Sequence, residues 1–225
     1  MTRNEPAEPE YPQYRYQPPP GATRLLLIRH GASAAARASE PFPLVDGHGD
    51  PELAPEGHDQ AKRVADRLAT AELAALYVTT LRRTAQTAAP LAERLGLVPR
   101  VEPDLREVHL GEWEGGLYRR HVAEGHPLAR RIAEEQRWDV IPGAESNEAF
   151  AGRVHAALAR LAAAHPGGQV AVFTHGGVIG QALALASRAA PLAFIGADNG
   201  SISELVVAGE RWIVRRFNDT AHLDD

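Results

Sequence analysis

Two histidines each stand directly after a run of apolar residues. Residues 25–31 read LLLIRHG and residues 169–177 read QVAVFTHGG, so His30 and His175 occupy matching positions. Both runs are too short to span a membrane and are typical of buried strands, and the glycine after each histidine permits a tight turn. In open α/β sheets, ligands bind outside the carboxyl ends of the strands, so we expect the two histidines to meet there.

Arginines near these strand ends indicate an anionic ligand. Arg29 lies beside His30, and an arginine is costly to bury unless an anion pairs with it. Its planar guanidinium can bind a carboxylate or a phosphate through two hydrogen bonds. Arg82 and Arg83 follow another short apolar segment, and since neighbouring helical residues lie about 100° apart, at most one of them can face a given spot. The backbone N–H groups at Gly176, where a helix should begin, also favour an anion.

Residues 104–116 read DLREVHLGEWEGG and offer a general acid or base. Glu107, Glu112 and Glu114 are the candidates. Their spacing does not choose between them, and carboxylates in such a segment can also be plain surface residues.

Two histidines with a carboxylate and arginines allow two kinds of chemistry. Two histidines and one carboxylate are a common catalytic zinc set. The alternative is an anion site with a nucleophilic histidine. Neighbouring arginines would repel a divalent cation, but they would stabilise a phosphoryl group and keep the histidine neutral by lowering its pKa. The charges therefore favour the anion site, with no metal.

The order of apolar patterns predicts an α/β fold, a three-layer α/β/α sandwich whose mainly parallel sheet has an antiparallel edge strand. Pro55 is placed to open the first helix, Pro90 should kink the second, and Ser146 is expected to be the N-cap of a later helix. Residues 32–51 show no period and are expected to form a long loop beside the site. We expect strands over 24–29, 76–79, 169–174, 202–207 and 212–217, and helices over 55–71, 81–95, 117–137 (one or two), 146–165 and 177–187.

Composition narrows the functional classes. The 225 residues suit one domain over residues 23–225 after a proline-rich, extended or disordered tail at residues 1–22. The net charge of −5 gives no reason to expect nucleic acid or a membrane as partner. The chain has no cysteine, which excludes disulfides, thiolate metal sites and a cysteine nucleophile. Nothing near the start resembles a signal peptide, so we expect a cytoplasmic protein.

Several stretches extend the histidine motifs in a fixed order between residues 25 and 203. They are LIRHG at 27–31, DPELAPEG at 50–57 followed by Gln60–Ala61, LRRTAQTA at 81–88, LRE at 105–107, GEWEG at 111–115, THGGVI at 174–179 and DNGSI at 198–202. In these motifs the chain resembles the histidine phosphatase superfamily, also called the phosphoglycerate mutase-like family. The resemblance selects Arg83 over Arg82, and Glu107 from the three carboxylates.

The resemblance implies a mechanism and a set of catalytic residues. His30 attacks the phosphoryl group and becomes a phosphohistidine, while Glu107 protonates the leaving oxygen and then helps water hydrolyse the intermediate. Arg29, Arg83 and His175, with Gly176, hold the phosphoryl oxygens. The resemblance implies no cofactor, a small phosphorylated metabolite as substrate, and inorganic phosphate as product.

The stretch after the first motif separates branches of the family. Mutases of the family usually continue Arg-His-Gly as Glu-Ser-x-Trp-Asn, whereas residues 32–36 here read ASAAA. The missing polar residues favour a metal-independent phosphomonoesterase over a cofactor-dependent phosphoglycerate mutase. A non-catalytic module that binds a phosphorylated ligand is the third interpretation. Ala54 also replaces the threonine that usually caps the following helix.

Substrate choice should depend on residues 108–145, which the resemblance implies form a cap over the site. This segment carries Trp113, Tyr118 and Trp138, and also arginines that could bind a second anionic group of the substrate. Nearby glutamates offset much of that charge, so most of these arginines are expected to lie on a solvated face. They are Arg119, Arg120, Arg130, Arg131 and Arg137. The predicted hairpin over 202–217 offers an edge for a homodimer.

Overall fold

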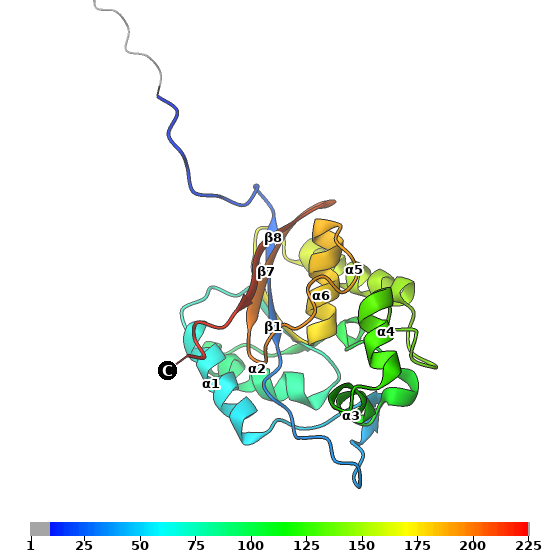
Figure 1. Cartoon of the computed structure of the whole chain (residues 1–225). Coiled ribbons are helices and arrows are strands. Elements are labelled where there is room, and N and C mark those ends of the chain that lie inside the picture. Colours follow the sequence, from blue (N-terminus) through cyan, green and yellow to red (C-terminus); the bar gives the residue numbers. More distant parts are fainter. Residues whose placement is uncertain (1–9, 225) are drawn as a thin grey trace, which may run out of the picture.

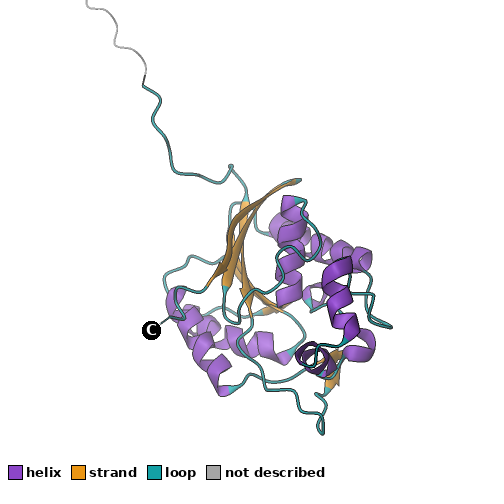
Figure 2. Ribbon diagram, viewed as in Figure 1, coloured by secondary structure: helices purple, strands orange, loops and turns teal. Residues whose placement is uncertain are grey.

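A six-stranded sheet forms the centre of the protein (Figure 1, Figure 2), whose computed structural model describes residues 10–224. Its order is β5-β4-β6-β1-β7-β8. The first four of these strands are mutually parallel, β7 pairs antiparallel with β1, and the edge strand β8 pairs antiparallel with β7. The strands are β1 Thr23–Arg29, β4 Ala75–Val78, β5 Arg100–Val101, β6 Gln169–Thr174, β7 Ile202–Ala208 and β8 Arg211–Asp219.

Helices cover both faces of this sheet. Figure 1 shows α5 and α6 on one side and α1 on the other, which is the expected three-layer α/β/α arrangement. The helices are α1 Pro55–Arg67, α2 Arg82–Leu95, α3 Leu117–Ala123, α4 Pro127–Glu135, α5 Asn147–Ala164 and α6 Gly176–Ser187. Two 3₁₀ turns, η1 Pro103–Leu105 and η2 Gly111–Trp113, and a small hairpin of β2 Leu44–Val45 and β3 His48–Gly49 complete the elements.

Strand β1 is apolar throughout because both of its faces are covered. Successive side chains of a strand point to opposite faces, so Leu25 and Leu27 pack in the cluster beneath α5 and α6. Leu26 and Ile28 pack in the second cluster, beneath α1 and α2. The neighbouring strand β6 divides its residues between the same two cores.

Most expected elements are present, with differences at their ends. Helix α1 ends at Arg67 rather than near residue 71, because the chain turns over residues 68–70. The break expected near Gly125–Pro127 separates α3 from α4, and Ser146 Oγ accepts the capping hydrogen bond from Ala149 N. Ala54 precedes α1 without a side-chain cap. Pro90 lies inside α2, which continues to Leu95.

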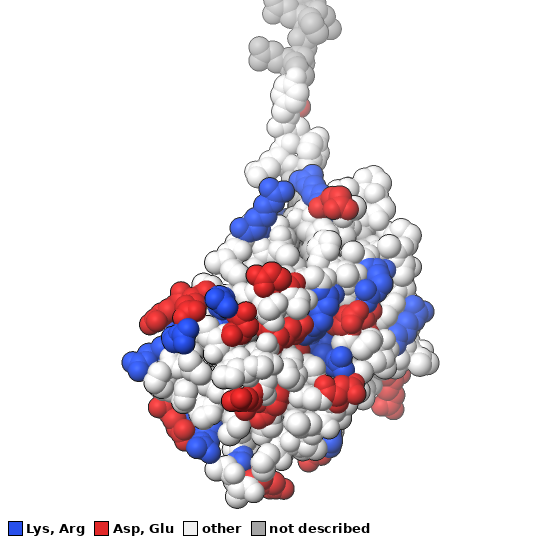
Figure 3. Space-filling model, turned by 90° about the vertical axis from the view of Figure 1, so that its right-hand side faces the viewer, with Lys and Arg blue, Asp and Glu red and all other residues white. Residues whose placement is uncertain are grey.

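The first described residues run away from the domain as an extended segment (Figure 1). Tyr11 and Tyr14 are exposed, whereas the Arg215 guanidinium carbon lies 3.8 Å from the centroid of the Tyr16 ring. The first nine residues of the predicted tail lie outside the described residues. Acidic and basic side chains are interspersed over the face in Figure 3. Among residues 10–224, no helix is both long and apolar enough to cross a membrane.

Candidate active site

Three parallel strand ends bring the predicted site residues together. Arg29, the last residue of β1, pairs in register with Thr174, the last residue of β6. His30 N donates to Thr174 O at 3.0 Å, so both histidines emerge from the same edge of the sheet. Their ring centroids lie 5.2 Å apart in an edge-to-face arrangement. The expectation that the two histidines meet at this edge is therefore met.

The surroundings of His30 fix its tautomer and its charge. Its Nδ1 lies 2.7 Å from Gly31 O, and because a carbonyl can only accept, Nδ1 carries the proton and Nε2 keeps its lone pair. Burial, and then the cations of Arg83 and Arg29, hold the pKa of His30 well below its ordinary value. A neutral imidazole with a free Nε2 is the form that can act as a nucleophile.

Gly31 follows His30 because no side chain fits there. A Cβ at Gly31 would lie 2.4 Å from Gly57 O, and one at Gly57 would lie 2.0 Å from Ala32 O. The loop after β1 thus packs its backbone against the first turn of α1. Thr87 Oγ1 accepts a hydrogen bond from Gly31 N at 3.0 Å and fixes the same turn from α2.

His175 is completely buried, and only one of its two ring nitrogens has a hydrogen-bond partner among the described residues. Its Nε2 forms a 3.0 Å hydrogen bond with Thr79 Oγ1, at the end of β4. Its Nδ1 is also buried, and no described residue hydrogen-bonds to it. Burial is again the main reason that the pKa of His175 lies well below its ordinary value, followed by the nearby Arg83. A buried polar atom without a partner is costly, and His175 is not among the residues that line the site cavity.

Arg29 and Arg83 are cations without carboxylate ion pairs among the described residues. Arg29 Nη1 donates to Ala197 O, and Arg83 Nη1 donates to Gly49 O at 2.9 Å. Both Nε atoms are buried without a described partner. Burial lowers the pKa of Arg29 and brings that of Arg83 to about 10. Two such cations beside two neutral histidines form a place for an anion.

Arg82 has a different partner from Arg83. Its Nε bonds Asp50 Oδ2 at 2.8 Å, and nearly half of its side chain is exposed. Neither Arg82 nor Asp50 is among the residues that line the site cavity. Of the two neighbours, only Arg83 lines the cavity.

Glu107 is the carboxylate that contacts the start of α6. Its Oε2 accepts from Gly177 N at 3.1 Å, at the start of α6, and its Oε1 accepts from Val108 N at 2.9 Å. Glu112 is exposed. Glu114 lines the same cavity, and its oxygens accept from Gly49 N at 2.7 Å and Leu110 N at 2.9 Å, so it contacts the β2–β3 hairpin rather than α6.

A cavity of about 230 Å³ opens in front of these groups. Residues 108–145 supply one wall, which includes Trp113, Tyr118 and Trp138. The loop over residues 32–51 supplies a second wall through Phe42 and His48, and the Phe42 ring adjoins Arg119 of the first wall. Arg29, His30, Arg83 and Glu107 line the cavity between the two walls.

Arg119 is the arginine of residues 108–145 that lines the cavity. Its Nη2 donates to Ser33 Oγ at 2.7 Å and its Nη1 to Ala34 O at 2.9 Å, so α3 is fastened to the loop after the first histidine. Burial, and then Arg29, lower the pKa of Arg119. Three other arginines pair with acidic neighbours on exposed surfaces, as expected. These pairs are Arg120–Glu124, Arg131–Glu135 and Arg137–Asp139.

The described residues contain no group of three or more histidines, aspartates or glutamates arranged to hold a metal ion. The carboxylate and the two histidines are instead accompanied by buried arginines. The arrangement can bind a phosphoryl group, and it offers His30 as a nucleophile and Glu107 as a proton donor in the same cavity.

The chain is similar to known proteins along most of its length. A sequence model of the histidine phosphatase superfamily (branch 1) matches residues 25–220. The chain belongs to the histidine phosphatase superfamily. A similar protein is phosphoglycerate mutase-like protein 4 of Arabidopsis thaliana, at 33% identity over 89% of this chain and 87% of the relative. A metal-independent phosphoserine phosphatase of the same plant is 32% identical over 89% of this chain and 83% of its own length.

A solved structure supports the same assignment. Mycobacterial glucosyl-3-phosphoglycerate phosphatase superposes with a TM-score of 0.74 and 30% identity, over 88% of this chain and all of that one. Other structures of that enzyme contain VO₃ or inorganic phosphate. With phosphatases among its relatives, this histidine phosphatase is a phosphoric monoester hydrolase.

Two parts of this histidine phosphatase site were not foreseen. His48 lines the cavity from the β2–β3 hairpin, whose two-residue turn is formed by Asp46 and Gly47, both at positive φ. An Asp-Gly pair is a strong hairpin signal, so the sequence did carry the information. Arg153 contacts the segment that bears Glu107, and it lies three residues after Phe150 on the apolar side of α5.

Proposed function

We propose that this protein is a metal-independent phosphomonoesterase that works through a phosphohistidine at His30. The observation that carries the proposal is the neutral His30, whose free Nε2 lies among buried, incompletely paired arginines. In the first step Nε2 forms a bond to phosphorus and the bond to the leaving oxygen breaks. Glu107 gives its proton to that oxygen. Arg29, Arg83 and His175, with the N-terminus of α6 at Gly176, stabilise the phosphoryl oxygens.

The second step returns the enzyme to its starting state. The Glu107 carboxylate takes a proton from water, the water oxygen bonds to phosphorus, and the electron pair of the N–P bond returns to Nε2. Inorganic phosphate leaves. Since the cations are part of the protein, neither step requires a metal ion.

A phosphatase is favoured over a mutase by the loop after His30. Residues 32–36 carry one polar side chain, Ser33, and that hydroxyl is occupied by Arg119. A mutase must keep water away from its phosphohistidine and hold a phosphoglycerate for the return transfer. The small side chains of this loop provide little for that purpose. Rapid exchange of phosphate between the positions of phosphoglycerate would favour the mutase.

The substrate is proposed to be a small phosphorylated metabolite that residues 108–145 cover as a cap. Tyr118, Trp113 and Trp138 offer an apolar and aromatic wall, and Arg119 adds a cation beside Arg29. This combination suits a phosphomonoester with a second anionic group. The names of two relatives, a phosphoserine phosphatase and a glucosyl-3-phosphoglycerate phosphatase, are compatible with such a substrate.

A phosphatase assay with a chelator tests the proposal. We expect turnover of p-nitrophenyl phosphate to persist in EDTA and to disappear in His30→Ala. Brief mixing of the wild type with substrate should leave a phosphorylated chain, visible by intact-mass spectrometry at neutral pH, which His30→Ala should not form. Loss of activity in EDTA, or full activity in His30→Ala, would refute the mechanism. A properly folded chain without activity on any phosphoester would favour the non-catalytic module.

A further inference from the structure

The segment that carries Glu107 has little secondary structure of its own. Glu107 lies between the short turns η1 and η2, outside the strands of the sheet. Such a segment keeps one conformation only if its peptide groups find partners elsewhere. The position of its carboxylate therefore depends on whatever holds the backbone of this segment.

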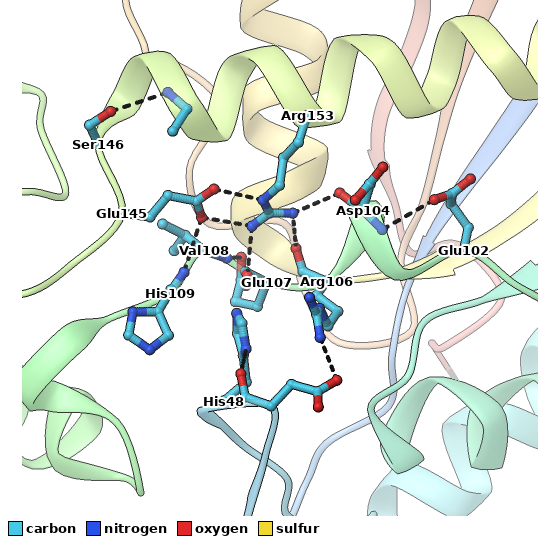
Figure 4. A network of polar contacts seen from close by, with 12 residues as sticks. His48, Glu102, Asp104, Arg106, Glu107, Val108, His109, Glu145, Ser146 and Arg153 are labelled. Atoms are coloured by element: carbon cyan, nitrogen blue, oxygen red, sulfur yellow. Dashed lines mark hydrogen bonds and ion pairs between the residues drawn. The ribbon is translucent and has the colours of Figure 1, made fainter.

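One side chain of α5, Arg153, binds this backbone at three points (Figure 4). Its Nη1 donates to Asp104 O at 2.7 Å and to Arg106 O at 2.8 Å, and its Nη2 donates to Glu107 O at 2.9 Å. A single planar group thus binds the two carbonyls that flank the Glu107 Cα, those of Arg106 and Glu107, and also the carbonyl of Asp104.

Glu145 completes the arrangement around Arg153. Its carboxylate accepts from Arg153 Nε at 2.7 Å and from Nη2 at 2.8 Å, which uses the remaining donors of the guanidinium. Glu145 also bonds His109 twice, through its own N–H to His109 O at 2.9 Å and through Oε2 from His109 N at 3.3 Å. Figure 4 shows Arg153 and Glu145 holding residues 104–109 from one side.

The carboxylate of Glu107 is held separately from its backbone. Gly177 N and Val108 N bind its two oxygens, and Gly177 belongs to α6, one residue after the helix begins. Helix α5 therefore fixes the main chain of Glu107 while α6 fixes its side chain. A shift of the main chain would carry the carboxyl group away from α6 and from the leaving oxygen.

We propose that Arg153 is a positioning residue for the general acid: it acts through the three carbonyls and sets the place of the Glu107 carboxyl group. Arg153 is not among the cavity-lining residues, so it does not act by touching substrate. The inference rests on the proposed role of Glu107. It adds that proton donation depends on a guanidinium outside the cavity.

Esters whose leaving groups differ in basicity distinguish a displaced general acid from a general loss of activity. p-Nitrophenolate leaves without a proton, whereas the alkoxide of benzyl phosphate needs one. The constant kcat/KM covers the steps up to loss of the leaving group. We expect Arg153→Lys to lower kcat/KM for benzyl phosphate about tenfold and for p-nitrophenyl phosphate less than about twofold, because displacement of a catalytic group weakens only the step that uses it. Arg153→Ala should show the same asymmetry, enlarged.

Arg160 provides a matched control on the same helix. Its Nη2 binds Glu102 Oε1 at 3.0 Å and Asp104 Oδ2 at 2.7 Å, but it contacts side chains rather than the Glu107 backbone and half of it is exposed. Arg160→Ala should leave both constants within about twofold of the wild type, as expected for an exposed ion pair. If Arg153→Ala does not fold, Arg153→Lys with this control still decides the matter.

Glu107→Gln distinguishes failure of this inference from failure of the proposed role of Glu107. Glu107→Gln should lower kcat/KM for benzyl phosphate at least as strongly as Arg153→Lys does. In that background Arg153→Lys should add no further loss, since both changes remove the same proton donation. Equal losses on both esters in Arg153→Lys, or additive losses in the double variant, would overturn the positioning role. A Glu107→Gln variant without asymmetry would overturn the role of Glu107 as the acid, and this inference with it.

Discussion

The main-chain N–H of Gly177 donates to Glu107 Oε2 at 3.1 Å, and the same glycine leaves no room for a side chain. A Cβ at Gly177 would lie 2.3 Å from Glu107 Oε1. The carboxyl group thus rests directly on the backbone of α6, two residues after His175. The first turn of α6 therefore fixes the position of the Glu107 carboxyl group relative to His175.

Gly177→Ala should therefore displace the carboxyl group and lower kcat about tenfold to a hundredfold on alkyl phosphates. Stability should not fall, because the end of a carboxylate side chain can move and alanine favours a helix over glycine by about 1 kcal/mol. Steady-state kinetics and urea unfolding measure the two effects. Unchanged kcat would show that Glu107 does not need its observed place.

Gly152 is the control for this substitution. It lies within α5, and a Cβ there would meet no atom within 4 Å. Gly152→Ala should raise the free energy of unfolding by up to about 1 kcal/mol and leave kcat unchanged. A loss of activity in this variant would mean that added helix stability, rather than displacement of Glu107, explains the first result.

Acidification should destabilise the fold through His30 and His175. Both have folded-state pKa values well below the ordinary one, mainly because of burial. Above about pH 6.5 neither state binds a proton at these residues. Below it the unfolded chain takes up protons and the folded chain does not. Stability should then fall by up to about 1.4 kcal/mol per histidine for each pH unit, until the folded-state pKa is reached.

Urea unfolding of the wild type and His30→Gln between pH 8 and pH 5 checks this dependence. The substitution removes one of the two histidines, so the slope of stability against pH below 6.5 should be shallower in the variant. Identical slopes would show that His30 is not held neutral by the fold. Other histidines contribute equally to both chains and cancel in the comparison.

The strands that carry the site could be predicted because the signal for each strand lies in its own few residues. A short, continuously apolar run is typical of a strand that is buried on both faces. The Arg-His-Gly and His-Gly-Gly sequences mark the ends of β1 and β6. The parallel pairing of these two strands, which lie far apart in the sequence, then places His30 beside His175. Fold and histidines thus followed from the same two stretches.

The remaining site residues depend on packing between distant segments. Nothing local distinguishes Arg83 from Arg82; the difference is that Asp50 lies where it captures only Arg82. Arg153 binds carbonyls more than forty residues away in sequence, which no periodicity encodes. The family resemblance supplied Arg83, whereas Arg153 required the three-dimensional arrangement.

Arg83→Gln should weaken binding of inorganic phosphate about tenfold to a hundredfold, since a hydrogen bond to a charged group contributes about 1.5–3 kcal/mol. Arg82→Gln is the control, because it removes a cation at the neighbouring position whose partner is Asp50. Its phosphate affinity should stay within about threefold, with a loss of stability near 1 kcal/mol. Titration calorimetry with phosphate measures both affinities. Equal weakening in the two variants would contradict the assignment of Arg83 to the anion site.

Substitution of Arg119 should change the choice of substrate, whereas substitution of Arg120 should not. Arg119 lines the cavity beside Arg29, whereas Arg120 pairs with Glu124 on the surface. In Arg119→Ala we expect kcat/KM to fall about tenfold or more for phosphomonoesters that carry a carboxylate, because a charge-assisted hydrogen bond is lost. Benzyl phosphate, which lacks a carboxylate, should lose less than about threefold, and Arg120→Ala should change neither. The measurement is kcat/KM over a panel of esters matched in size. If Arg119→Ala lowers all esters equally, its role is to fasten α3 to Ser33 and Ala34 rather than to select the substrate.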